Sequence, residues 1–95
     1  IVVINNGGGG IFRILNGART SPICSRYLQA AHRKSVEPLA RLHNWEYRAA
    51  DDTESLREAL RDFWEPSSHP RMLEVFTREE DNDEVLRGYF SYLSE

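Results

Sequence analysis

The sequence is poor in cysteine, in positive charge and in long apolar runs, and each shortage excludes a class of protein. A single cysteine, Cys24, rules out an internal disulfide and a cysteine-based zinc site, which fits a reducing cytoplasm. The formal net charge of −3 argues against a nucleic-acid-binding surface, because such surfaces present basic stripes. No apolar run has the length of a membrane-spanning helix, and no signal peptide is recognisable.

The length and the start of the chain indicate a part of something larger. A chain of 95 residues with 40% hydrophobic residues can bury one modest core. Residues 1–4 form an unbroken aliphatic run, which predicts a strand buried on both faces of a parallel sheet. Such a strand needs neighbours on both sides, and few further strands follow. We therefore expect residues 1–95 to be a single-domain fragment from the C-terminal part of a larger α/β enzyme.

The hydrophobic pattern predicts alternating strands and helices. We expect two further strands, at 45–49 and 71–77, the last one buried on both faces. The expected helices span about 22–31, 36–43 and 53–64, followed by a closing helix whose first turn lies in the acidic stretch 78–84 and whose apolar face starts at Val85. Alternation of this kind predicts a three-layer α/β fold, a parallel sheet with helices on both faces.

The helical periodicity also predicts which side chains face the core. Those expected to face inward are Ile23, Tyr27, Leu28, Val36, Leu39, Ala40, His43, Leu56, Ala59, Leu60, Phe63, Val85, Leu86, Tyr89, Phe90 and Leu93. Asn44 is the expected left-handed residue after the second helix, and Asp51, Asp52 and Thr53 supply caps for the third. We expect residues 13–20 to form a loop with a turn at Asn16-Gly17.

The first strand leads into two amides, Asn5 and Asn6, and then into four glycines, Gly7 to Gly10. Strands of parallel sheets deliver functional groups at their C-terminal ends. Glycines are costly in regular structure, but their bare backbone lets carbonyl and N–H groups approach a ligand closely. Two amides followed by bare backbone indicate a seat for a hard cation, a phosphate, or both. The alternative is a flexible turn, which four consecutive glycines weaken because a tight turn needs only one or two positive φ values.

Two well-known phosphate-binding patterns do not fit this stretch. The dinucleotide fingerprint needs a helix directly after the glycines and an acid about 20 residues later. Here the first helix signal is Ser21-Pro22, which lies too far downstream. The Walker pattern needs Lys-Ser or Lys-Thr after the glycines, and neither is present.

The segment 2–12 resembles the second half of the thiamin-diphosphate motif, which closes with Asn-Asn after an upstream Gly-Asp pair. The Gly-Gly-Gly-Ile-Phe continuation is similar to that of the 2-succinyl-5-enolpyruvyl-6-hydroxy-3-cyclohexene-1-carboxylate synthase family of menaquinone biosynthesis. Segments 36–40, 45–47 and 73–77 also resemble the C-terminal end of that family, so the resemblance covers nearly the whole chain. Gly7 departs from the pattern, because the family more often has Asn or Asp there.

The resemblance implies a place in the C-terminal part of a cofactor diphosphate- and metal-binding domain. The parent would decarboxylate 2-oxoglutarate and add the succinyl-semialdehyde carbanion to isochorismate, as a cytoplasmic homodimer or homotetramer. Asn6, through its side-chain oxygen, and Gly8, through its carbonyl, would bind Mg²⁺ or Mn²⁺. Thiamin diphosphate would contact the residues Asn6, Gly8, Gly9, Ile11 and Phe12, and Leu15 would line the substrate pocket.

The same resemblance implies that this chain is inert by itself. The metal-binding aspartate and the activating glutamate of the superfamily have no match here, so the chain needs the remainder of its parent as a partner. One alternative is another thiamin-diphosphate enzyme, similar to acetolactate synthase. A second is a non-enzymatic α/β module whose glycine loop binds an anion or a partner chain.

The other candidate residues favour structural roles. The apolar residues Ile11, Phe12, Ile14 and Leu15 either plug the edge of the core or form a wall over a cofactor. For the basic patch of Arg26, His32, Arg33 and Lys34, a solvated face is favoured over a dianionic substrate or a diphosphate. His32 has no partner at metal-ligand spacing. For Glu74, a solvent or salt-bridge role is favoured over a catalytic one, because no second acid converges with it in the sequence.

Overall fold

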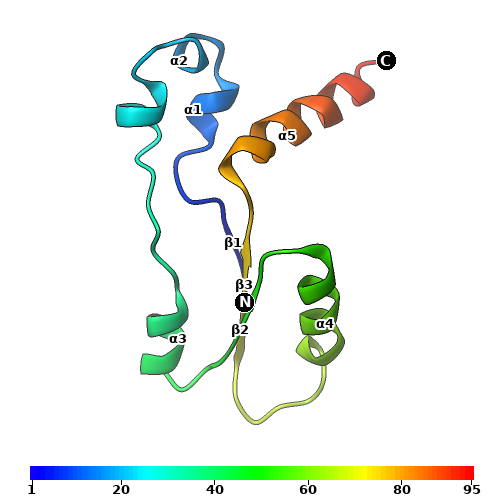
Figure 1. Cartoon of the computed structure of the whole chain (residues 1–95). Coiled ribbons are helices and arrows are strands. Elements are labelled where there is room, and N and C mark those ends of the chain that lie inside the picture. The colour runs from blue at the N-terminus through cyan, green and yellow to red at the C-terminus, as the bar shows by residue number, and fades with distance from the viewer. The chain divides into compact units, whose positions relative to one another are not determined.

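The computed structural model describes all residues from 1 to 95, and its elements follow the expected alternation (Figure 1). The strands are β1 (Val2–Asn5), β2 (Glu46–Ala50) and β3 (Arg71–Phe76). The helices are α1 (Ile11–Ile14), α2 (Asn16–Arg19), α3 (Glu37–Leu42), α4 (Thr53–Phe63) and α5 (Glu79–Leu93), with a π-helical turn η1 (Cys24–Leu28). The chain divides into two units, Ile1–Asn5 with Lys34–Phe76, and Asn6–Arg33 with Thr77–Glu95.

The first unit is a parallel sheet with a helix on each side. Its strand order is β1-β3-β2, and Leu73 of β3 pairs with Val2 on one side and Arg48 on the other. α3 and α4 lie on opposite sides of the sheet (Figure 1). The core consists of Ala50, Ala59 and Leu73 with the α4 side chains Leu56, Leu60 and Phe63 against it. The predicted α/β fold and the predicted inner face of α4 are both confirmed.

The strands differ in how deeply they are buried. β3 is central, and its Met72, Leu73 and Glu74 are all buried, as expected. For β1 the expectation of burial on both faces is wrong in this chain, since Val2 is exposed and Ile4 is 62% exposed. The register places both on the same face as Leu73 and Val75. α4 packs over β2 and β3 on that face and leaves β1 uncovered.

The ends of α3 and α4 follow the local sequence signals. Asn44, directly after α3, has a positive φ of 57°, which confirms the expected left-handed position. At the start of α4, the Asp52 carboxylate accepts a hydrogen bond from the Ser55 N–H at 2.7 Å, and the Ser55 hydroxyl accepts one from the Asp52 N–H at 3.2 Å. This reciprocal pair is a capping box. α3 buries only Ala40, while the expected Leu39 is exposed, because a short helix covers little of the sheet.

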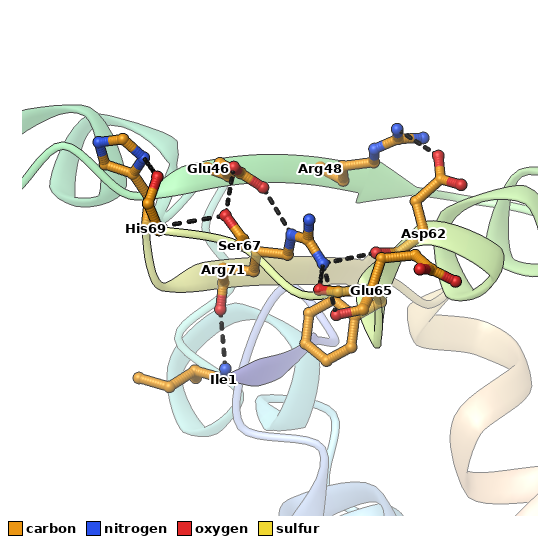
Figure 2. Close-up of polar contacts among 10 residues, drawn as sticks. Ile1, Glu46, Arg48, Asp62, Glu65, Ser67, His69 and Arg71 are labelled. Atoms are coloured by element: carbon orange, nitrogen blue, oxygen red, sulfur yellow. Dashed lines mark hydrogen bonds and ion pairs between the residues drawn. The ribbon is translucent and has the colours of Figure 1, made fainter.

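Arg71, at the start of β3, ties three elements together (Figure 2). Its main-chain carbonyl accepts a hydrogen bond from the Ile1 amino group at 2.8 Å, and its Nε lies 2.5 Å from the Glu46 carboxylate of β2. Its Nη1 donates to carbonyl oxygens at the end of α4, those of Asp62, Phe63 and Glu65. Since the last carbonyls of a helix lack partners within the helix, the guanidinium acts as a C-terminal cap for α4.

The second unit departs most from the sequence predictions. In place of the expected loop 13–20, the chain forms two one-turn helices, of which α1 begins directly after Gly10 and α2 follows it. The expected helix 22–31 is only the turn η1, in which the Gln29 N–H bonds to the Cys24 carbonyl five residues back. This spacing puts Cys24 and Gln29 inside and leaves Tyr27 63% exposed, so the predicted inward face was wrong.

The closing helix α5 begins within the acidic stretch, as expected, and contacts α1. Arg13 of α1 lies 3.5 Å from Glu79 and 3.6 Å from Asp83 of α5. The apolar side chains expected on the inner face of α5 are exposed in this chain, among them Val85, Tyr89 and Phe90. No helix in the structure combines the length and the apolar character needed to cross a membrane.

Candidate cofactor and metal site

The glycine loop starts where the chain leaves β1. Asn5 is the last residue of the strand, and Asn6 opens the loop in the second unit. Gly7 has a positive φ of 74°, a conformation that glycine adopts without steric cost. The side-chain oxygen of Asn6 accepts a long hydrogen bond of 3.3 Å from the Gly8 N–H, which turns the chain back on itself.

Gly8 and Gly9 are required by contacts within the chain. A Cβ atom on Gly8 would lie 2.9 Å from the Gln29 carbonyl oxygen and 3.2 Å from the Ala31 Cα. A Cβ atom on Gly9 would lie 3.1 Å from the same Gln29 oxygen, to which the Gly9 N–H donates at 2.6 Å. Glycine is therefore needed at these two positions because the loop packs closely against residues 29–31. This requirement holds whether or not a ligand binds.

Each of the two predicted metal ligands, Asn6 and Gly8, has an oxygen that can accept a further interaction. The Asn6 side-chain oxygen accepts only the long bond from Gly8, and the Gly8 carbonyl accepts from the Gly10 N–H at 3.0 Å. Each such oxygen has a second lone pair. Hard cations such as Mg²⁺ prefer oxygen ligands and often complete their shell with phosphate oxygens and water. Two neutral oxygens could supply only part of such a shell, and the structure contains no cluster of three acidic, His or Cys side chains that could complete it.

The predicted cofactor and substrate contacts follow the loop directly. Ile11 and Leu15 are exposed, whereas Phe12 and Ile14 are half-buried. The ring of Phe12 packs against Gly9, 3.1 Å from where a Cβ atom would lie. Exposure of Ile11 and Leu15 removes the alternative that these two plug the core of this chain. All the predicted site residues, from Asn6 to Leu15, thus lie on one short stretch of the second unit.

Gln29 is a buried residue beside the loop that sequence reasoning did not find. Its side chain is 0% exposed, and neither its amide oxygen nor its amide nitrogen has a hydrogen-bond partner in the structure. The following residue, Ala30, has a positive φ of 49°, which directs the chain past the glycines. The periodicity of an ordinary helix could not reveal this arrangement, because it depends on the wider turn of η1.

Glu74 is also buried, and its surroundings differ from both sequence interpretations. Its side chain is 0% exposed and takes part in no salt bridge, so the favoured solvent or salt-bridge role was wrong. The donors to its two oxygens are all neutral: the Asn5 amide, the Ser35 hydroxyl and the Tyr47 hydroxyl, each at 2.7 Å, and the Val36 N–H at 3.2 Å. A charged residue in the middle of a central strand was the available sequence signal.

Asn5 is committed to this cluster. Its amide nitrogen donates to the Glu74 carboxylate at 2.7 Å and to the Lys34 carbonyl at 2.8 Å. Both of its N–H groups are therefore used inside the first unit. The amide nitrogen of Asn5 therefore has a structural role in the first unit.

The hydrogen bonds keep Glu74 ionised. Burial raises the pKa of its carboxyl, but the hydrogen bonds from Tyr47, Ser35, Asn5 and Val36 together lower that pKa below its usual value. The pKa of Tyr47 is raised by burial and by its bond to the Glu74 carboxylate. At neutral pH the Glu74 carboxylate is therefore ionised, and it accepts hydrogen bonds from uncharged amide and hydroxyl groups.

The basic side chains show no built site. Arg26, His32, Arg33 and Lys34 are exposed, in agreement with the solvated face that the sequence favoured. Arg26 lies over the ring of Tyr27, with its guanidinium carbon 5.3 Å from the ring centre. The main-chain N–H of His32 donates to the Gly7 carbonyl at 2.7 Å, so this residue supports the loop through its backbone.

Comparison with known proteins found no matching family model, but it found clear relatives among curated proteins. The chain is 39% identical over 93 residues to a 2-succinyl-5-enolpyruvyl-6-hydroxy-3-cyclohexene-1-carboxylate synthase of Christiangramia forsetii, and 43% identical over 94 residues to that of Flavobacterium johnsoniae. It is 33% identical over 95 residues to the synthase of Bacteroides fragilis. These alignments cover 98%, 99% and 98% of this chain.

The same alignments cover only 16%, 17% and 17% of the three relatives. The chain therefore spans about a sixth of the length of the curated relatives that it matches, consistent with the expected C-terminal piece. Similarity runs through the glycine loop, the sheet and the closing helix, because nearly every residue of the chain is aligned. Over nearly its whole length, the chain is therefore similar to one segment of the 2-succinyl-5-enolpyruvyl-6-hydroxy-3-cyclohexene-1-carboxylate synthases.

Proposed function

We propose that this chain supplies the metal end of the cofactor site in a thiamin-diphosphate-dependent carboligase. The parent would decarboxylate 2-oxoglutarate and join the resulting carbanion to isochorismate, in the cytoplasm and as a homodimer or homotetramer. The observation that carries the proposal is the Asn6–Phe12 stretch, set within a chain that aligns almost completely with the named synthases.

The residues of the loop would divide the work of holding the cofactor. Asn6 and Gly8 would offer their oxygens to Mg²⁺ or Mn²⁺, and Gly9 would give the diphosphate close access to the backbone. The cofactor itself supplies the chemistry that stabilises the carbanion. Ile11 and Phe12 would exclude water from its reactive end, and the exposed Leu15 would contact substrate.

The site is incomplete within these 95 residues. Neutral oxygens alone bind a divalent cation weakly, and no group of three potential metal-binding side chains lies in this chain. The aspartate and the activating glutamate would come from the remainder of the parent. We therefore expect the isolated chain to show no turnover above a heat-killed control.

The decisive test uses a complete enzyme that contains this segment. With thiamin diphosphate and Mg²⁺ present, we expect turnover of 2-oxoglutarate with isochorismate and none of pyruvate alone. Asn6→Ala should reduce kcat/KM at limiting Mg²⁺ by roughly a hundredfold, since one metal ligand is lost. Asn16→Ala, which removes an exposed amide from α2, is the matched control and should change it less than about twofold.

Each other outcome selects a different function. Turnover of pyruvate in place of 2-oxoglutarate would assign the chain to an acetolactate-synthase-like enzyme. Failure to bind thiamin diphosphate and Mg²⁺ at all would exclude a thiamin-dependent enzyme and favour an anion- or partner-binding module. Equal losses in Asn6→Ala and Asn16→Ala would remove Asn6 from the metal site.

A further inference from the structure

The Glu74 cluster consists of Glu74 and the groups that donate to it, from Asn5, Ser35, Val36 and Tyr47. It includes or adjoins the residues at which the chain passes between the two units. The chain passes from one unit to the other after Asn5, before Lys34 and after Phe76. Asn5 and the carbonyl of Lys34 are both bound in the cluster, and Glu74 itself lies two residues before Phe76. Donors from β1, β2 and the segment before α3 thus converge on one buried carboxylate of β3.

Asn5 belongs to this cluster and is joined by one peptide bond to Asn6, the first residue of the glycine loop. Asn5 precedes Asn6, whose side-chain oxygen is the predicted metal ligand. The Asn5 amide is held at two points, 2.7 Å from Glu74 and 2.8 Å from the Lys34 carbonyl. A side chain held by two hydrogen bonds has little rotational freedom, so Asn5 is held in place at the end of β1.

We propose that Glu74 is a positioning residue for the glycine loop, acting through Asn5 to set where Asn6 and Gly8 present their oxygens. The proposal rests on the proposed function where it concerns the metal, but the order of the loop can be measured without it. Glu74 touches neither metal nor substrate in this role. It acts by holding Asn5, the residue that precedes the proposed ligands.

Tyr47 provides a matched control within the same cluster. Its hydroxyl donates to Glu74 at 2.7 Å, the same distance as the Asn5 amide, but Tyr47 is the second residue of β2 and does not adjoin the glycine loop in the chain. Tyr47→Phe and Asn5→Ala each remove one donor from the same buried carboxylate. A merely structural cluster would respond alike to both, whereas a positioning cluster would transmit only the loss of Asn5 to the loop.

The first measurement is amide hydrogen exchange of this chain by NMR. In Asn5→Ala and Glu74→Gln we expect the loop amides of Gly9 and Gly10 to exchange at least about tenfold faster, relative to the β3 amide of Leu73. In Tyr47→Phe the same ratio should change less than about twofold. Asn5→Ala keeps the test decisive if Glu74→Gln does not fold. Equal changes in all three variants, or no change of the ratio in Asn5→Ala, would overturn the proposal.

The second measurement is Mn²⁺ binding by EPR to the complete enzyme with thiamin diphosphate. We expect Asn5→Ala to raise the Kd for Mn²⁺ by about tenfold, and Tyr47→Phe to leave it within about twofold of the unsubstituted value. If the unsubstituted enzyme does not bind Mn²⁺, the proposed function fails, while the exchange ratio still decides the positioning role. If it binds and Asn5→Ala binds equally well, the positioning of the metal ligands is wrong.

Discussion

Two fully buried polar side chains differ in whether hydrogen bonds compensate for their lost hydration. Glu74 accepts hydrogen bonds from four groups, whereas the Gln29 amide has a partner for neither its oxygen nor its nitrogen. A buried polar group without a partner loses its hydration without compensation. The two residues therefore differ in what a substitution does to the stability of the fold.

The charge of Glu74 makes stability depend on acid. Its folded pKa lies below its ordinary value of 4.5, so its contribution is present above that value and is lost as the pH falls through the folded pKa. We expect Glu74→Gln to lower the free energy of unfolding by about 3 kcal/mol at pH 7, because the amide faces donors that need an acceptor. Urea unfolding at several pH values measures this. The difference from the unsubstituted chain should shrink as the pH falls below 4.5, and a constant difference would contradict the ionised state.

Gln29 makes the reverse prediction. Gln29→Met keeps the length of the side chain and removes both polar atoms that lack partners. We expect it to raise the free energy of unfolding by about 1 kcal/mol. Gln29→Ala is the control and should lower it by about 2 kcal/mol, because it leaves a cavity. Destabilisation by methionine would mean that a bound water or ligand satisfies the amide.

At the level of elements, α4 is the best-anchored helix of the chain. It has a capping box at Asp52, an apolar face on the core and the Arg71 guanidinium at its last carbonyls (Figure 2). Arg71 also binds Glu46, and this bond lowers the pKa of the Glu46 carboxyl. One side chain thereby joins β3, β2 and the end of α4.

The fork shape of the guanidinium is what makes this possible. Arg71→Lys keeps the positive charge but cannot bind the carboxylate and the helix carbonyls together. We expect it to lower the free energy of unfolding by about 2 kcal/mol, measured by urea denaturation. Arg48→Lys is the matched control, since the Arg48–Asp62 pair is exposed and should be worth less than about 0.5 kcal/mol. Equal losses in the two variants would show that Arg71 contributes through its charge alone.

At the level of the whole molecule, the chain exposes much apolar surface. Exposed large side chains occur along β1, in the segment after the glycine loop and on α5, where Tyr92 is 74% exposed. A lone soluble domain rarely keeps so many, and such patches mark surfaces that bind other chains. This agrees with the expectation that further polypeptide packs against this chain.

This surface predicts the behaviour of the isolated chain. We expect it to bind the dye ANS and to self-associate as its concentration rises, measured by fluorescence and light scattering. Val85→Lys with Tyr92→Lys should reduce both signals, whereas Arg57→Lys, on α4, should change neither. A monomer that binds no dye would contradict the need for a covering partner.

The sequence by itself determined the α/β class, the three strands, the limits of α4, the presence of a closing helix and the glycine loop with its resemblance to the named synthases. These depend on local signals such as apolar periodicity, caps and a short motif, which can be read without knowing what lies nearby in space. Tertiary structure alone decided that β1 is an edge strand here, that Cys24 and Gln29 face inward, and that Asn5, Ser35 and Tyr47 meet at Glu74. The reason is that these features join residues up to 69 positions apart, or depend on a π turn, and neither is encoded in local periodicity.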